Sequence, residues 1–230
     1  MSRGWLVWCL AAVMAAVSVS AFADPNDPRS RYPESVAEYE GDFRFVRIRY
    51  TSWGDGSNYQ FYGRWAIDYP DAEQHFSLRL SQLTTIKVAR DEYGEFEPRV
   101  IRLSDKTLFN YPFVYLIEPG QLVFQENEIE PLREYLLRGG FMMVDDFWGE
   151  AEWKNWEVQL ARVFPPDEYP IVELPLEHPI FHIVFDLKEK PQVPAAYHWA
   201  QTRTTYERLD AKEPHYRGIF DEKGRLMMIM

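Results

Sequence analysis

Residues 112–150 read PFVYLIEPGQLVFQENEIEPLREYLLRGGFMMVDDFWGE, and this stretch decides the fold class. PFVYLI at 112–117 and FMMV at 141–144 are apolar runs typical of buried strands. Between them, Ile129, Leu132 and Leu136 recur at helical spacing, and Gly139 with Gly140 supplies a left-handed stop. Strand, helix and strand within about thirty residues predict a right-handed parallel crossover, the unit of α/β folds. We therefore expect an α/β fold with a three-layer parallel sheet.

The segments on either side extend this pattern. A helix is expected after residue 149, with Trp156, Leu160 and Val163 on one face. Upstream, Pro70 fits the first position of a helix that carries Phe76, Leu80 and Leu83 on one face. The remaining extended segments are expected at residues 43–50 (FRFVRIRY), 85–89, 99–103, 218–220 and 226–230.

The N-terminus has the layout of a secretory signal peptide. Arg3 precedes an uncharged apolar run at 5–17, and Ala21-Phe22-Ala23 places small residues at the two positions that signal peptidase reads. We expect cleavage after Ala23, although residues 4–23 are just long enough for an uncleaved membrane anchor. The predicted organisation is therefore a signal peptide at 1–23, a Pro-containing linker or arm at 24–41, and a single α/β domain at 42–230. The product would be periplasmic or secreted, with no transmembrane segment after cleavage.

Composition excludes several classes of function. The chain is 46% hydrophobic and 27% charged, which is ordinary globular usage. Its 36 acidic against 25 basic residues give a net charge of −11, so this acidic protein would repel a phosphate backbone, and no nucleic-acid partner is expected. The single cysteine, Cys9, lies inside the predicted signal peptide. The mature domain would therefore have no disulfide, thiolate zinc site or cysteine nucleophile.

The strongest candidate site follows the second apolar run of the opening stretch. Asp145 and Asp146 end that predicted strand, and Trp148 and Glu150 come directly after. Ligands of open parallel sheets gather beyond the carboxyl ends of strands, where two carboxylates can ligate a divalent cation or share acid and base roles. The alternative is that an aspartate only caps the next helix. We favour a cap for one of the two.

A second acidic group surrounds the predicted helix start at Pro70. Asp68 and Asp71 are expected first of all to cap that helix. If the first strand lies beside the later ones, however, this turn opens on the same sheet edge as Asp145. The two acidic turns would then form a site for a hard cation or a polyol.

Other chemical motifs are weak or missing in the sequence. His178 and His182 are four apart in HPIFH, which would align two imidazoles on a helix, but no glutamate accompanies them as in a zinc-protease helix. We favour a structural reading, with Phe181 and Ile183 in the core, and predict no metal site there. The sequence has no glycine-rich phosphate loop, G-x-S-x-G elbow or dinucleotide fingerprint. No cofactor is expected, apart from a divalent metal at the acidic pair.

Several segments resemble the bacterial domain-of-unknown-function family 4159: FRFVRIRY, WAIDYPDAEQHFSLRL, LFNYPFVYLIEPG, LREYLLRGGFMMVDDFWGEAEW, HPIFH, PQVP and GIFDEKGRLMMI. The resemblance implies a flavodoxin-like sheet related to class I glutamine amidotransferases, in a family without an established activity, and a cell-envelope setting. Amidotransferase activity is not carried over, because the predicted mature domain has no cysteine. Family members usually continue beyond the final strand, so the resemblance also implies a C-terminal truncation at Met230.

Two functions follow from these observations. The first is a non-catalytic envelope module that binds a small ligand or an envelope protein through the edge at 145–153. Its candidate ligand-binding residues are Asp68, Asp71, Asp145, Asp146, Trp148 and Glu150. The alternative is a metal-assisted or two-carboxylate hydrolase with a carbohydrate-type substrate, in which Asp145 and Asp146 act as ligands or base and Glu150 as acid. Whether the protein is an enzyme, and its oligomeric state, remain open at this point.

Overall fold

A seven-stranded sheet forms the centre of the computed structural model, which describes residues 41–53 and 63–230. The strand order is β3-β1-β4-β6-β9-β8-β7, and β3, β1, β4, β6 and β9 are parallel. β8 is antiparallel to β9, and β7 is antiparallel to β8, so the sheet is mixed and not wholly parallel as expected. In sheet order the strands are β3 (Arg99–Ile101), β1 (Val46–Ile48), β4 (Phe113–Ile117), β6 (Phe141–Asp145), β9 (Leu226–Ile229), β8 (Arg217–Phe220) and β7 (Val172–Glu173).

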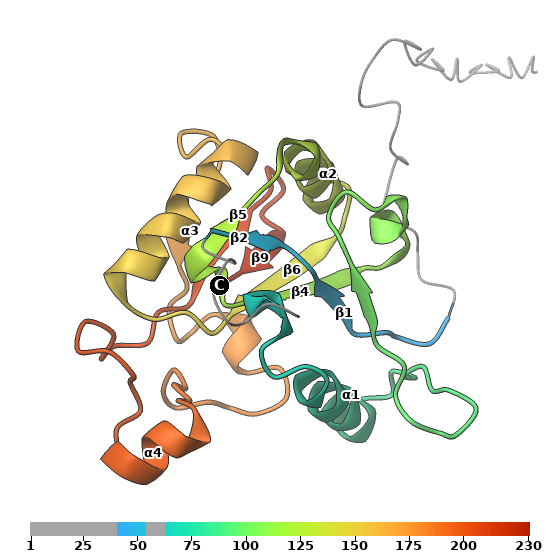
Figure 1. Ribbon diagram of the computed structural model, residues 1–230, viewed down its shortest axis with the longest axis horizontal. Coiled ribbons are helices and arrows are strands. Elements are labelled where there is room, and N and C mark those ends of the chain that lie inside the picture. Colours follow the sequence, from blue (N-terminus) through green and yellow to red (C-terminus); the bar gives the residue numbers. More distant parts are fainter. Residues whose placement is uncertain (1–40, 54–62) are drawn as a thin grey trace, which may run out of the picture. The chain divides into compact units, whose positions relative to one another are not determined.

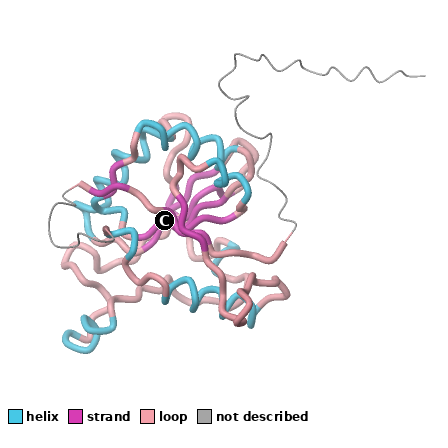
Figure 2. The backbone as a smooth tube through the Cα atoms, turned by 45° about the vertical axis from the view of Figure 1, so that its right-hand side comes forward, coloured by secondary structure: helices cyan, strands magenta, loops and turns pink. Residues whose placement is uncertain are grey.

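Helices cover both faces of the sheet. Figure 1 shows α1 (Asp71–Leu83) on one face and α2 (Glu126–Leu137) with α3 (Gly149–Val163) on the other. The strands therefore form the middle layer of three, which the tube in Figure 2 shows from a second angle. A short helix, α4 (Ala196–Thr202), lies away from the sheet, and β2 (Thr51–Ser52) pairs with β5 (Leu122–Val123) as a small separate sheet.

The face under α2 and α3 holds the larger apolar cluster. Leu132 and Leu136 of α2 and Trp156 of α3 are fully buried against Val114 and Met142 of the central strands. α2 ends where Gly139 takes a φ of +110°, a conformation that costs glycine little. The predicted strand–helix–strand crossover is therefore confirmed, as is the buried face of α3.

The face under α1 is smaller and aromatic. Phe45 and Tyr115 are buried there, and the rings of Phe45 and Phe76 meet edge to face with centroids 5.1 Å apart. The same face contains a fully buried ion pair between Arg47 of β1 and Glu73 of α1. An amphipathic helix normally buries its apolar stripe, but the buried residues of α1 are Glu73 and Ser77, and Phe76 is only partly buried.

Three details of the expected fold are wrong near α1. Residues 85–89 form no strand, because only Val88 makes a bridge there, to Phe43. Leu83 is 47% exposed, since the burial of Glu73 and Ser77 turns the helix away from the predicted face. Pro70 is the N-cap residue and not the first helical residue, because α1 begins at Asp71.

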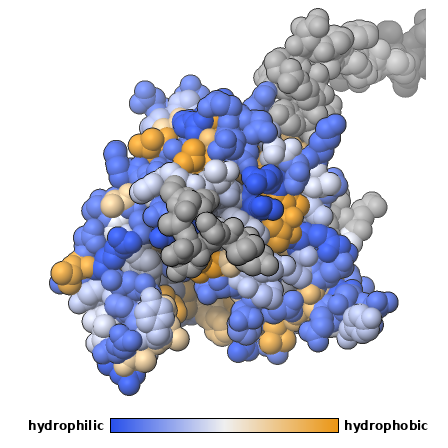
Figure 3. All heavy atoms as spheres, viewed as in Figure 1, coloured by the Kyte–Doolittle hydropathy of each residue, from blue (hydrophilic) through white to orange (hydrophobic). Residues whose placement is uncertain are grey.

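The segment between α3 and β8, residues 164–216, has little regular structure. Phe181 is buried as predicted, whereas Ile183 is 75% exposed, because it follows a single 3-10 turn at Pro179–Phe181 that turns only Phe181 inward. Within residues 41–53 and 63–230, no helix is long and apolar enough to cross a bilayer. On the face shown in Figure 3, the hydrophobic residues outside the grey part form small separate patches among hydrophilic ones.

Candidate functional site

The strand order reverses between β1 and β4. β3 extends the sheet from β1 in one direction, and β4 and β6 extend it in the other. In open α/β sheets, ligands bind at the carboxyl ends of the strands beside such a reversal. Glu118 follows β4, Asp145 ends β6 and Asp146 comes directly after it, and Asp68 lies in the turn before α1. We call these four carboxylate residues the acidic edge.

Three of the four residues have left-handed backbone conformations. The φ angles are +57° at Asp68, +54° at Glu118 and +56° at Asp146. Among the described residues, Arg203 is the one other non-glycine residue with a positive φ. Such conformations cost about 1–3 kcal/mol each outside glycine and concentrate at functional sites. Their gathering at one edge of the sheet marks this edge as the candidate site.

Glu118 is held from two sides. Its carboxylate accepts a hydrogen bond of 2.8 Å from Nη1 of Arg64, and Arg64 also donates from Nε to Gln121 at 2.9 Å. The hydroxyl of Tyr50 donates to the backbone oxygen of Glu118 at 2.7 Å. Burial and the nearby charge of Asp146 raise the pKa of Glu118 to about 7, against the opposing effect of Arg64. Glu118 therefore exchanges a proton near neutral pH.

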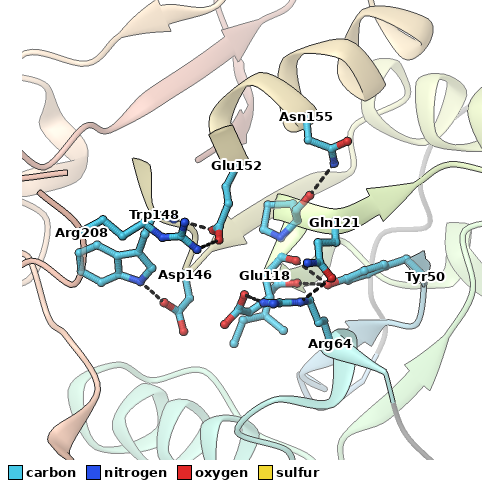
Figure 4. A network of polar contacts seen from close by, with 11 residues as sticks. Tyr50, Arg64, Glu118, Gln121, Asp146, Trp148, Glu152, Asn155 and Arg208 are labelled. Carbon is cyan, nitrogen blue, oxygen red and sulfur yellow. Dashed lines mark hydrogen bonds and ion pairs between the residues drawn. The ribbon is translucent and has the colours of Figure 1, made fainter. Parts of the chain in front are cut away.

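Asp146 lies next to Glu118, and Figure 4 shows the two side chains between Arg64 and Arg208. The indole N–H of Trp148 donates to the Asp146 carboxylate at 2.9 Å. Burial raises the pKa of Asp146 to about 6, and the charges of Asp145 and Asp68 add to this effect. The two residues thus form a pair of interacting carboxylates with raised pKa values.

Asp145 connects the acidic edge to the α1 face. Its carboxylate accepts from the Tyr115 hydroxyl at 3.1 Å and from the backbone N–H of Asp146 at 2.9 Å. Desolvation raises the pKa of Asp145, and the charge of Asp68 acts in the same direction. The residue nevertheless keeps solvent contact at the end of β6, which limits that rise.

Neither aspartate of the pair caps α3, so the expectation of a cap there is wrong. The backbone N–H of Trp148 donates to Glu152 at 2.8 Å, and that of Glu150 donates to Asp210 at 3.1 Å. Asp210 comes from sixty residues further along the chain. It packs so closely that a Cβ on Gly149, whose φ is +77°, would lie 2.6 Å from its carboxylate. A residue distant in the sequence thus accepts a hydrogen bond from the first turn of α3, and the carboxylates of Asp145 and Asp146 are not used as helix caps.

The predicted caps of α1 are absent as well. No side chain caps this helix, and Asp71 is an exposed first-turn residue. Asp68 contributes only its backbone oxygen, which accepts from Ala72 at 2.9 Å. The turn before Asp68 is fixed by Arg47, whose Nη1 donates to the backbone oxygens of Trp65 at 2.9 Å and Ile67 at 3.0 Å.

The structure thus brings together four of the six candidate residues. Asp68, Asp145, Asp146 and Trp148 gather at one edge, whereas Asp71 and Glu150 take no part in the interactions described above for these carboxylates. Glu118 was not among the candidate residues predicted from the sequence. The one signal in the sequence is its position directly after a predicted buried strand. Because Pro119 and Gly120 follow, this position was interpreted as an ordinary turn.

Metal ligation finds no support in the side-chain arrangement. In the described part of the chain, no three histidine, cysteine or acidic residues are placed so that they could hold a metal ion. His178 accepts from the backbone N–H of Ile180 at 3.3 Å, and His182 contacts Asp186 at 2.7 Å. Lys154, which could have neutralised the aspartate pair, instead lies 3.6 Å from Glu157. The edge therefore remains a cluster of carboxylates with Arg64 and Trp148 at its sides.

Comparison with known proteins gives one positive result. A search of curated proteins finds no match to this chain. A family model described as "Domain of unknown function (DUF4159)" matches residues 44–230, which is most of the chain and includes every residue of the acidic edge. The chain therefore belongs to the DUF4159 family, in agreement with the resemblance found in its sequence.

Proposed function

We propose that this domain is a non-catalytic binding module that takes a small polyhydroxylated ligand, a sugar or polyol, at the acidic edge. The observation that carries the proposal is the gathering of Asp68, Asp145 and Asp146 without a cation. None of the three has a lysine or arginine ion-pair partner within 41–53 and 63–230. Each ionised carboxylate offers two acceptor oxygens, and hydroxyl groups are matching donors.

The neighbouring residues support a ligand of this kind. Trp148 lies beside Asp146, and tryptophan offers an apolar ring surface on which sugars stack. Arg64 is held against Glu118 and Gln121, so it is a preorganised donor at the opposite side. The strained conformations of Asp68, Glu118 and Asp146 are expected where a binding site is preorganised.

The proposal includes the finer fold assignment. Counted along the chain, the five parallel strands have the spatial order 2-1-3-4-5, which is the order of flavodoxin-like folds. This order supports a flavodoxin-like domain of the kind found in class I glutamine amidotransferases. In that fold the reversal between the first and third strands is the usual place for a ligand, and the acidic edge lies there.

The proposed setting is the cell envelope. The signal-peptide prediction rests on residues 1–23, and the linker prediction on 24–41, of which only residue 41 is described. Both predictions stay as made from the sequence. An exported module without cysteine suits the capture of extracytoplasmic polyols or sugars, and an envelope protein that carries such groups is an equally suitable partner.

Calorimetric titration with neutral monosaccharides, disaccharides and linear sugar alcohols tests the proposal. We expect at least one probe to bind at pH 8, and Asp146→Asn to weaken it about tenfold by removing a charged acceptor. Glu150→Gln is the matched control, because Glu150 is close in sequence but outside the cluster. The proposal fails if no probe binds, or if the control weakens binding as much as Asp146→Asn does.

A hydrolase is the second candidate, and one observation favours it. Glu118 and Asp146 interact and have pKa values of about 7 and about 6, which suit a general acid and a general base near neutral pH. This pair replaces the Asp145, Asp146 and Glu150 set expected from the sequence. If the candidate is correct, hydrolysis of aryl glycosides should follow a bell-shaped pH profile, and Glu118→Gln should abolish it. Binding without hydrolysis leaves the module as the function.

A further inference from the structure

A concave site lies away from the acidic edge, between α3 and the antiparallel end of the sheet. It is an open cavity of about 600 Å³, within the range of small-molecule sites. Trp153 and Glu157 of α3 form one side, and the strands β7 and β8 with the segments before them form the rest. The remaining lining residues are Ile171, Glu173, Lys190, Glu213, Pro214, His215 and Arg217.

Three basic side chains meet on one carboxylate in this cavity. Nζ of Lys190 lies 2.5 Å from Oε1 of Glu173, while Nδ1 of His215 and Nε of Arg217 each lie 3.2 Å from Oε2. Burial acts to raise the pKa of Glu173, but the hydrogen bonds from Lys190, the Tyr216 backbone and His215 hold it below its ordinary value. Glu173 is therefore ionised, and it neutralises only one of the positive charges around it.

Arg217 is the best placed of these donors. Its guanidinium carbon lies 3.9 Å from the ring centroid of Trp153, and that ring is stacked on Phe147 with centroids 5.9 Å apart. Of the three guanidinium nitrogens of Arg217, only Nε has a hydrogen-bond partner among the described residues, so the two terminal nitrogens are available to a ligand. A guanidinium held against an aromatic ring presents a fixed fork of donors, which suits a carboxylate.

Charge of the opposite sign lines the same cavity. Glu213 has no ion-pair partner in the part of the chain that the structure describes, and Glu157 has only Lys154 at 3.6 Å. A simple anion would be repelled by these two carboxylates, and a simple cation by the basic cluster. A ligand that carries both charges, one at each end of a short chain, meets a partner for each.

We propose that this cavity binds a short peptide with free termini, its carboxylate on Arg217 and Lys190 and its ammonium group on Glu213. Ile171, Pro214 and the edge of Trp153 supply apolar contacts for the peptide between its two ends. This site is independent of the acidic edge: it uses different residues and takes a ligand of another chemical class.

Titration with trialanine tests the proposal, because its termini are its only charges. Trialanine should bind, and N-acetyl-trialanine and trialanine amide should each bind about tenfold more weakly, since each lacks one charge. Arg217→Met should weaken the binding of trialanine and of its N-acetyl form, which keeps the carboxylate. Glu213→Gln should weaken the binding of trialanine and of its amide, which keeps the ammonium group.

The control variant is Arg79→Met, an exposed residue of α1 that contacts only Gln82 among the described residues. It should bind trialanine as the parent does. Because Arg217 also packs on Trp153, Glu213→Gln provides a second variant, at an exposed position, if Arg217→Met does not fold. The proposal is overturned if trialanine does not bind at millimolar concentration, if the blocked peptides bind as tightly as trialanine, or if Glu213→Gln binds trialanine like the parent.

Discussion

The two faces of the sheet are built on different principles. The face under α2 and α3 is closed by fully buried apolar side chains such as Leu132, Leu136 and Trp156. The face under α1 has three buried residues in its cluster, Phe45, Tyr115 and Ile117, and places the ion pair of Arg47 and Glu73 beside them. Hydrophobic burial stabilises the first face without directional demands, whereas the second depends on one specific arrangement of charges.

The difference is related to the candidate site. Arg47 holds the turn that ends at Asp68, and Tyr115 of the same face donates to Asp145. The α1 face therefore supports the acidic edge directly, and its polar interior has a positional role. The α2 and α3 face supplies the stable frame on which this edge is built.

The largest effect is expected from Arg47→Met. The variant leaves Glu73 buried without its counter-charge, and breaking a buried pair in this way costs about 3–5 kcal/mol. Urea denaturation followed by tryptophan fluorescence measures the loss. A loss below about 1 kcal/mol, the value of an exposed pair, would show that the two faces do not differ as described.

The double variant Arg47→Met with Glu73→Met sharpens the same point. Nη2 of Arg47 and Oε2 of Glu73 have no hydrogen-bond partner among the described residues, so the pair is incompletely satisfied. Replacing both charges should therefore recover much of the stability that the single variant loses. The backbone oxygens of Trp65 and Ile67 lose a donor in both variants, which keeps the recovery partial.

Leu136→Ala tests the apolar face. Leu136 is fully buried in the larger cluster, and truncation of such a leucine costs about 2–5 kcal/mol. Because no charge is involved, the loss should be the same at pH 5 and pH 8, as measured by denaturation at both values. A loss below about 0.5 kcal/mol would place Leu136 at the surface.

Asp210→Ala should have a smaller effect, about 1 kcal/mol, because Asp210 accepts from the first turn of α3 as a capping residue does. Asp145→Asn should not share this loss, since Asp145 makes no contact with the α3 amides among the described hydrogen bonds. Thermal denaturation of the two variants separates the cap from the candidate site. Equal losses of stability in the two variants would indicate that Asp145 also caps α3.

The smallest effect concerns pH. Burial raises the pKa of Glu118 from its ordinary value of 4.5 to about 7, so the folded state binds its proton more tightly than the unfolded state does. The stabilisation from this proton is full below about pH 4.5 and is lost as the pH rises through about 7. As the pH rises from about 4.5 to about 7, the free energy of unfolding of Glu118→Gln should therefore increase by about 1 kcal/mol relative to that of the parent, after allowance for solvent screening. A difference that does not change with pH would contradict the shift.

The sequence predicted the apolar face well and the α1 face poorly, for a physical reason. The strands at 112–117 and 141–144 and the leucines of α2 follow local rules of burial and spacing, and the structure confirms them. The burial of Arg47 depends on Glu73, which is 26 residues away, and no local sequence pattern predicts this pairing. The spacing of the apolar residues consequently predicted Leu83 on the buried face of α1, whereas it is exposed.

In the candidate site, too, local features were predictable from the sequence and tertiary ones were not. Asp145 and Asp146 were found because residues at the end of a buried strand have a predictable place in a parallel sheet. Their separation from the helix cap was not predictable, because the cap comes from Asp210. Glu118 was missed since its left-handed conformation and its contact with Arg64 are both tertiary features.

The position of β9 has a consequence for how this chain acquires its structure. β9 lies between β6 and β8, in the interior of the sheet, yet it is formed by residues 226–229. During synthesis, the backbone groups along one side of β6 consequently stay unpaired until these residues have left the ribosome. An open strand edge of this kind readily pairs with other chains. β3, β1, β4 and β6 can assemble early, but the open side of β6 is protected from aggregation only when β9 inserts, which makes chaperone binding during synthesis advantageous.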